Sequence, residues 1–105
     1  MSQMFRQGDL LFVKIEANAI PNNAKAGDGI LALGEATGHH HKLVGGDHFT
    51  FAVNDGALRQ FAKMGEAPAM VTHQEHATIE LPGLTAWEVF RQREYSPTQL
   101  RNVMD

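Results

Sequence analysis

Cysteine is absent from all 105 residues, which excludes disulfides, thiolate catalysis and metal sites built on sulfur. No run of about 18 apolar residues occurs, and the first residues contain no apolar segment of signal-peptide length. The nine Lys and Arg residues are scattered and the net charge is −3, so the chain lacks a basic stripe for phosphates. We therefore expect a cytoplasmic protein without a membrane span or a nucleic-acid partner, whose metal ligands, if any, are His, Asp or Glu.

The length and the apolar content of 43% predict one domain, over residues 1–105, with a single core. Short segments rich in β-branched and aromatic residues alternate with turn residues, which is typical of an antiparallel sandwich or a small barrel. A short C-terminal α-helix is predicted over residues 97–104, because Ser96, Pro97 and Gln99 form a helix start. The predicted strands are residues 10–15, 30–33, 39–44, 48–53, 57–64, which is favoured over a short helix, and 84–93, the last with a bulge or with burial that changes along its length. Residues 69–81 form either one strand or two segments joined by a bulge or turn.

Half of the six histidines lie in one short segment, His39-His40-His41, which follows Gly38 and begins a predicted strand. Side chains two residues apart in a strand point to the same side, about 7 Å apart, so His39 and His41 can face one ion. Leu43 has the same parity, which indicates that this face is the inner one and that His40 points away. The alternative is an exposed turn that carries three histidines.

A second group of candidate ligands lies in residues 69–81. If this segment is one strand, its apolar end fixes an inner face that includes His73 and Glu75 and excludes His76. A turn at residues 74–75 would instead bring His73 and His76 together, because three-residue spacing suits a turn. The sixth histidine, His48, is expected to face solvent, because Phe49, Phe51 and Val53 share the other face of their strand.

Together these two segments predict a divalent metal site. Its ligands are His39, His41 and His73, with Glu75 or His76 as a further ligand, a donor set that suits Zn, Fe, Mn or Ni. An open coordination position would allow the ion to activate water or polarise a carbonyl, whereas a closed site would only brace the fold. The alternative is that inward His and Glu side chains hydrogen-bond one another without an ion.

Near the C-terminus, Arg91, Arg93 and Tyr95 in the segment Arg-Gln-Arg-Glu-Tyr could line a pocket for an anionic ligand. A solvated strand end is the simpler interpretation.

Two resemblances to known families bear on these motifs. The His39-x-His41 pair in a strand-rich chain resembles the metal motif of the cupins, small β-barrels that commonly hold a divalent metal with three His and a Glu. The chain as a whole resembles a family of small uncharacterised proteins of bacteria and their phages. That resemblance is carried by Arg6-Gln7-Gly8-Asp9, Thr37-Gly38-His39-x-His41, His73-x-Glu75-His76-Ala77 and Arg91-Gln92-Arg93-Glu94-Tyr95.

Two functions remain open from the sequence. The first is divalent-metal binding at the histidines, with or without catalysis. The second is a non-enzymatic interaction module, phage-derived on the resemblance above, that binds a protein or an anionic ligand and uses its histidines structurally. A homodimer is compatible with either function, because small sheets leave edges that pair.

Overall fold

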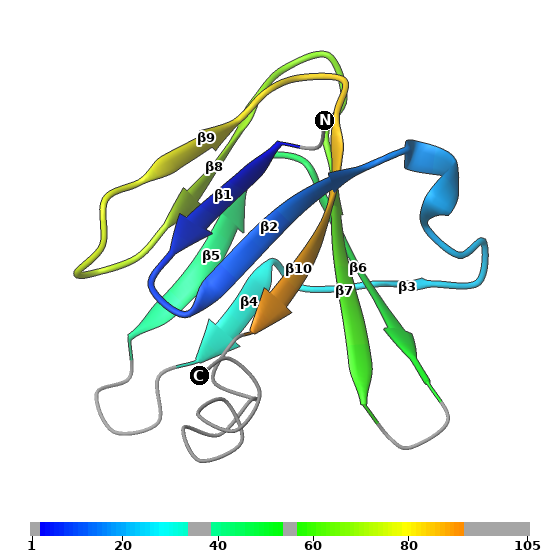
Figure 1. Ribbon diagram of the computed structural model, residues 1–105, viewed down its shortest axis with the longest axis horizontal. Helices are drawn as coiled ribbons and strands as arrows, with labels where there is room; N and C mark the ends of the chain where they lie inside the picture. The colour runs from blue at the N-terminus through cyan, green and yellow to red at the C-terminus, as the bar shows by residue number, and fades with distance from the viewer. Residues whose placement is uncertain (1–2, 34–38, 54–56, 92–105) are drawn as a thin grey trace, which may run out of the picture.

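The computed structural model describes residues 3–33, 39–53 and 57–91, and these form two antiparallel β-sheets (Figure 1). The six-stranded sheet has the order β1-β2-β10-β7-β6-β3, and the four-stranded sheet has the order β4-β5-β8-β9. The predicted all-β class is confirmed, while the helix predicted over residues 97–104 lies outside the described residues. The strands are β1 Met4–Gln7, β2 Leu10–Ile15, β3 Lys25–Ala26, β4 Ile30–Leu33, β5 His40–Val44, β6 Asp47–Ala52, β7 Leu58–Lys63, β8 Ala69–Thr72, β9 Ile79–Leu81 and β10 Ala86–Arg91, with one 3-10 turn, η1, at Ala17–Ala19.

The hydrophobic core lies between the two sheets, so the arrangement is the sandwich of the two predicted architectures. In β2, β5, β8 and β10 alternate residues face this core, and its largest fully buried side chains each contribute about 1.5–3 kcal/mol by leaving water. Within the described part of the chain, no helix is long and apolar enough to cross a membrane. The six-stranded sheet supplies Leu10, Phe12, Ala62, Trp87 and Val89 to the core, and the four-stranded sheet supplies Leu31, Ala32, Leu43, Ala69, Val71 and Leu81.

The strand predicted over residues 84–93 begins two residues later than predicted, at Ala86, and keeps an unbroken register to Arg91, while residues 92–93 lie outside the described residues. Strand β10 pairs with β2 residue by residue, from Ala86 opposite Ile15 to Arg91 opposite Leu10, so it contains no bulge. Its middle is buried on both faces, because Glu88 on the outer face is held by Arg59 through two hydrogen bonds of 2.8 and 2.9 Å. Of the two features predicted for this strand, a bulge or a change of burial along its length, the strand has the second.

His48 points into the protein, and the prediction that it faces solvent is wrong. The residue is only 7% exposed, and both of its ring nitrogens are paired. Its Nδ1 accepts the backbone N–H of Gly29 at 3.0 Å, and its Nε2 lies 2.9 Å from Oε1 of Gln60. Gln60 uses its amide nitrogen to donate to the carbonyl of Leu31, so its oxygen faces His48 and His48 Nε2 carries the proton.

The reversed parity of β6 has a physical reason. His48 lies opposite the core residue Ala62, while Phe49 lies opposite Phe61, which is fully buried on the outer face of the six-stranded sheet. Phe49 and Phe51 are half-buried on that face. The apolar face of this strand, which carries Phe49 and Phe51, lies beside Phe61 on the outer side of the sheet, so alternation identifies two faces without telling which one is the core.

One end of the sandwich gathers the chemistry-bearing segments, at the lower left of Figure 1. The turn between β1 and β2, the start of β5, the connection between β8 and β9, and the end of β10 all lie there. Gln7 and Arg91 both pair with Leu10 at the beginning of β2, which brings three strand ends of one sheet to the same level. Side chains far apart in the sequence therefore converge at this end.

Candidate metal site at one end of the sandwich

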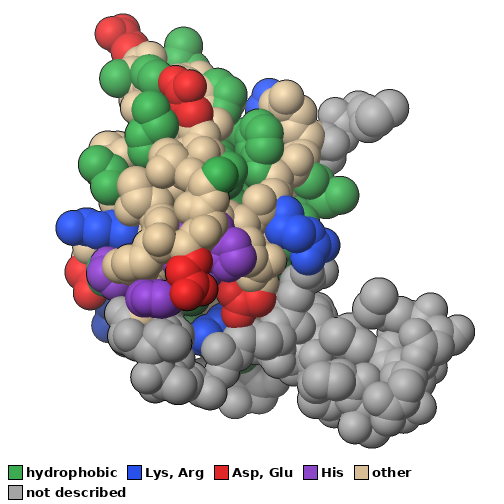
Figure 2. Space-filling model, turned by 90° about the vertical axis from the view of Figure 1, so that its left-hand side faces the viewer, with side chains coloured by type: hydrophobic (Ala, Val, Ile, Leu, Met, Phe, Trp, Pro, Cys, Tyr) green, Lys and Arg blue, Asp and Glu red, His purple; other side chains and the backbone are tan. Residues whose placement is uncertain are grey.

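Four histidines and two carboxylates form one group at this end, which we call the histidine cluster. Figure 2 shows histidine and acidic side chains side by side on this part of the surface. The cluster joins segments of both sheets, because the β1–β2 turn belongs to the six-stranded sheet and the other segments belong to the four-stranded one. Its members are Asp9, His39, His41, His73, Glu75 and His76.

His41 is the buried centre of the cluster. It is 5% exposed and shares its face of β5 with buried Leu43, as predicted. Its Nδ1 lies 2.8 Å from Oε1 of Gln7, whose amide nitrogen donates to the carbonyls of Val71 and Ala77, each at 2.8 Å. With both amide hydrogens directed at carbonyls, the oxygen of Gln7 must face His41. Nδ1 of His41 therefore carries a proton.

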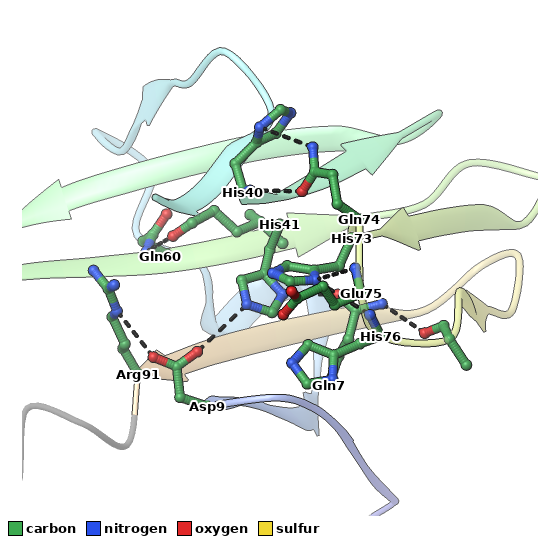
Figure 3. Close-up of polar contacts among 12 residues, drawn as sticks. Gln7, Asp9, His40, His41, Gln60, His73, Gln74, Glu75, His76 and Arg91 are labelled. Carbon is green, nitrogen blue, oxygen red and sulfur yellow. Dashed lines mark hydrogen bonds and ion pairs between the residues drawn. The ribbon is translucent and has the colours of Figure 1, made fainter. Parts of the chain in front are cut away.

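The other nitrogen of His41 faces a carboxylate. Nε2 lies 3.4 Å from Oδ1 of Asp9, and Oδ2 of the same carboxylate lies 3.3 Å from Nε of Arg91 (Figure 3). Burial raises the pKa of Asp9, but the hydrogen bond and charge of Arg91, a backbone hydrogen bond and the charge of His41 together lower that pKa below its usual value. Asp9 is thus ionised at neutral pH.

His41 is neutral at the same pH. Burial lowers its pKa from 6.5 to about 4, helped by the positive charge of His73 and to a lesser extent that of His76, and the attraction of Asp9 offsets only part of this. A neutral imidazole with its proton on Nδ1 has a bare lone pair on Nε2. Two hydrogen-bond acceptors, His41 Nε2 and Asp9 Oδ1, therefore face each other across 3.4 Å.

The segment between β8 and β9 is a turn, so the prediction of one strand over residues 69–81 is wrong and its stated alternative is confirmed. The backbone N–H groups of Glu75 and His76 donate to Nδ1 of His73, at 3.0 and 3.3 Å. This turn brings the rings of His73 and His76 to a centroid distance of 4.6 Å, and it brings His73 to 4.3 Å from His41. Burial and the charges of His76 and His39 lower the pKa of His73.

His39 and Glu75 form the outer part of the cluster. Nδ1 of His39 lies 3.6 Å from Oε2 of Glu75, and the ring of His39 stands edge-on to that of His73, 5.7 Å away. Glu75 is exposed, so its predicted inward position is wrong: the turn directs it outward. His40 points away from the cluster as predicted, and its backbone N–H donates to Oε1 of Gln74 at the top of Figure 3.

Gly8 allows the two sheets to approach each other here. It has a φ of +60°, and a Cβ at this position would lie 2.7 Å from Nε2 of His76 and 3.2 Å from Cε1 of His41. The same two rings are nearly parallel, 11° apart in orientation and 6.1 Å between centroids. A residue without a side chain is therefore required both by the backbone and by the neighbouring imidazoles.

The structure brings all five predicted ligands into one group, but it does not hold them as a finished metal site. Among the residues described, no three His, Asp or Glu side chains already have the arrangement of metal ligands. Of the residues predicted to bind an anion, Arg91 contacts the cluster through Asp9, and Arg93 and Tyr95 lie outside the described residues. Imidazole and carboxylate donors together suit the divalent transition metals that the sequence suggested.

Sequence reasoning missed Asp9 and Gln7. The segment Arg6-Gln7-Gly8-Asp9 carried only the family resemblance, and no strand was predicted before residue 10. The polar residues of the Gln7-Gly8-Asp9 segment gave one usable signal, because a turn that links two strands delivers its side chains to a sheet end. Nothing local could have placed them beside His41, 34 residues from Gln7.

Comparison with known proteins identifies a family. The model of a family described as a domain of unknown function, DUF8820, matches residues 6–92, a range that contains the whole histidine cluster. Neither the curated proteins nor the solved structures contain a match to the chain.

Proposed function

The chain belongs to the DUF8820 family, and we propose that it binds one divalent transition metal ion between His41 and Asp9. The observation that carries this proposal is the pair of facing acceptors, Nε2 of His41 and Oδ1 of Asp9. Facing lone pairs repel unless a cation lies between them. In a protein that cation is a proton or a metal ion.

The separation of the two atoms favours the metal ion. A hydrogen bond between an imidazolium and a carboxylate is typically about 2.7–2.9 Å long. Bonds of about 2.1 Å from zinc to nitrogen and oxygen, at a tetrahedral angle, place the two ligand atoms about 3.4 Å apart. In the structure, His41 Nε2 and Asp9 Oδ1 are 3.4 Å apart. The pair is thus too wide for a strong shared proton and has the width that two ligands of one ion require.

The β8–β9 turn supplies the further ligands in this proposal. Among the residues described, neither ring nitrogen of His76 has a hydrogen-bond partner, so His76 is the third ligand we assign. His73 accepts two backbone hydrogen bonds at Nδ1, so its neutral form carries the proton on Nε2 and must reorganise the turn before that nitrogen can bind metal. His39 and Glu75 form an outer pair that reaches the ion only if the turn closes further.

Three protein ligands would leave a coordination position for water or for a ligand atom. Arg91 lies beside this position through its contact with Asp9, so an anionic group is the ligand we expect there. The anion-binding role predicted for Arg93 and Tyr95 stays a prediction, because both lie outside the described residues.

The experiment that tests the proposal is zinc binding by untagged protein, measured as stoichiometry by elemental mass spectrometry and as affinity by titration calorimetry. Wild-type protein is expected to hold one zinc ion, and Asp9→Asn is expected to lose it, because an amide is a poor ligand of nearly the same size. Asp47→Asn, at an exposed acid on β6, is the matched control and should keep the zinc. Equal zinc content in wild type and Asp9→Asn would contradict the proposal.

A second candidate is the interaction module in which the histidines only support the fold. The two backbone hydrogen bonds to His73, and the absence of a ready set of three ligands in the described residues, favour it. In that case zinc would not bind, and His73→Ala would lower the free energy of unfolding by releasing two N–H groups of the turn. Urea denaturation of that variant, with and without zinc, separates the two candidates.

A further inference from the structure

The side chain of Gln7 contacts both His41 and the connection between β8 and β9 that carries His73 and His76. The residue ends β1 and is 2% exposed, so its carboxamide is shielded from water. Its oxygen accepts the N–H of His41, and its nitrogen donates to the carbonyls of Val71 and Ala77. These two carbonyls lie on either side of the turn that carries His73 and His76. One amide therefore fixes the buried imidazole and the base of the turn.

We infer that Gln7 is the positioning residue of the site: it selects the tautomer of His41 that directs the Nε2 lone pair at Asp9, and it sets the position of the ligand-bearing turn. The inference rests on the proposed metal site for its functional meaning. Its structural content, which nitrogen of His41 carries the proton, is independent of any metal. Groups that bond the far nitrogen of a ligating histidine typically change metal affinity about 10–100-fold when they are removed.

The chain contains a natural control. Gln60 bonds His48 in the same way, with its oxygen toward the ring and its nitrogen on the carbonyl of Leu31. The tautomer is reversed, however, because Gly29 donates to Nδ1 of His48. Replacing Gln60 removes an equivalent amide bridge between the two sheets without touching the proposed metal ligands.

The test combines the variants Gln7→Met and Gln60→Met with long-range ¹H–¹⁵N NMR of the imidazoles in metal-free protein, and with zinc titration calorimetry. Methionine has nearly the length of glutamine but supplies none of its three hydrogen bonds. We expect wild-type His41 to carry its proton on Nδ1 and Gln7→Met to move it to Nε2, where Asp9 can accept it. Zinc affinity should fall about 10–100-fold in Gln7→Met and stay within error in Gln60→Met.

A further variant keeps the inference testable if Gln7→Met does not fold. Gln7→Glu keeps an acceptor for His41 and loses both donors, so it should restore the Nδ1–H tautomer even if the turn is destabilised. A wild-type His41 with its proton on Nε2, or an unchanged tautomer and zinc affinity in Gln7→Met, would overturn the inference. A wild-type protein that takes up no zinc would overturn the proposed function, and the tautomer of His41 would still decide the role of Gln7.

Discussion

His41 and His48 are two buried histidines in strands of different sheets, and each is bonded to a glutamine that also donates to a carbonyl of the four-stranded sheet. In His48, the second ring nitrogen receives a backbone N–H and the ring is fully paired. In His41, the second ring nitrogen meets the carboxylate of Asp9. The histidine–glutamine pair is thus fully hydrogen-bonded at His48, whereas at His41 one ring nitrogen faces a position that a cation can occupy.

The difference shows that burial and a glutamine partner do not by themselves identify a functional histidine. The group that faces the second nitrogen decides the role: a donor satisfies the ring, whereas an acceptor leaves a position for a cation. Location agrees with this distinction, because His48 lies opposite the core residue Ala62, while His41 lies near the start of β5 in contact with Asp9 and with the β8–β9 connection. Turns and connections at sheet ends are common positions for binding groups.

The largest expected effect is on zinc binding, which should differ between His41→Ala and His48→Ala. His41→Ala should abolish zinc binding, and in metal-free protein the loss of the opposed acceptors should offset part of the cost of leaving the oxygen of Gln7 unpaired. His48→Ala should keep zinc binding but lower the free energy of unfolding by about 1–3 kcal/mol for each buried partner it leaves unpaired. Calorimetric zinc titration and urea denaturation of both variants check this. Loss of zinc in both variants, or in neither, would break the comparison.

A smaller effect is expected from a methyl group at Gly8. Gly8→Ala should cost about 1–2 kcal/mol for the left-handed backbone and, by pressing on His76, weaken zinc binding about tenfold. Gly45→Ala is the matched control, because Gly45 has a φ of +81° and its added Cβ would meet only ordinary contacts at 3.7 Å. Both variants should lose similar stability in denaturation experiments. Equal zinc affinities in the two variants would show that His76 is not a ligand.

The last effect concerns pH in metal-free protein and involves no metal ion. The pKa of His41 is lowered to about 4 on folding, so between about pH 6.5 and pH 4 the unfolded chain binds a proton that folded His41 does not. This contribution to stability is complete above about pH 6.5 and is lost as the pH falls toward 4. His41→Ala should flatten the fall of the urea midpoint over this range. Parallel curves for wild type and His41→Ala would contradict the assignment.

The sequence was sufficient for the fold class and for part of the site. Alternation located most strands, and the shared parity of His41 and Leu43 correctly predicted a buried imidazole. The turn alternative correctly predicted that His73 and His76 meet, since three-residue spacing is a local property. These successes depend on short-range geometry, which a sequence carries directly.

Long-range pairing and the choice of the buried face were beyond the sequence. Gln7 reaches the carbonyl of Val71, 64 residues away, and no local pattern specifies that contact. In the strand of His48 the apolar face is the outer one, so its inner face depended on which side the second sheet would cover. Asp9 was missed for both reasons, since a turn aspartate acquires its role only when β5 and β10 are in place beside it.

The most direct test of the central claim is a zinc titration of wild-type protein followed by the ¹⁵N signals of its imidazoles. The Nε2 signal of His41 is expected to shift and to saturate at one equivalent of zinc, while both signals of His48 stay unchanged. A His41 signal that does not respond to zinc, or a response at His48 of equal size, would contradict the central claim.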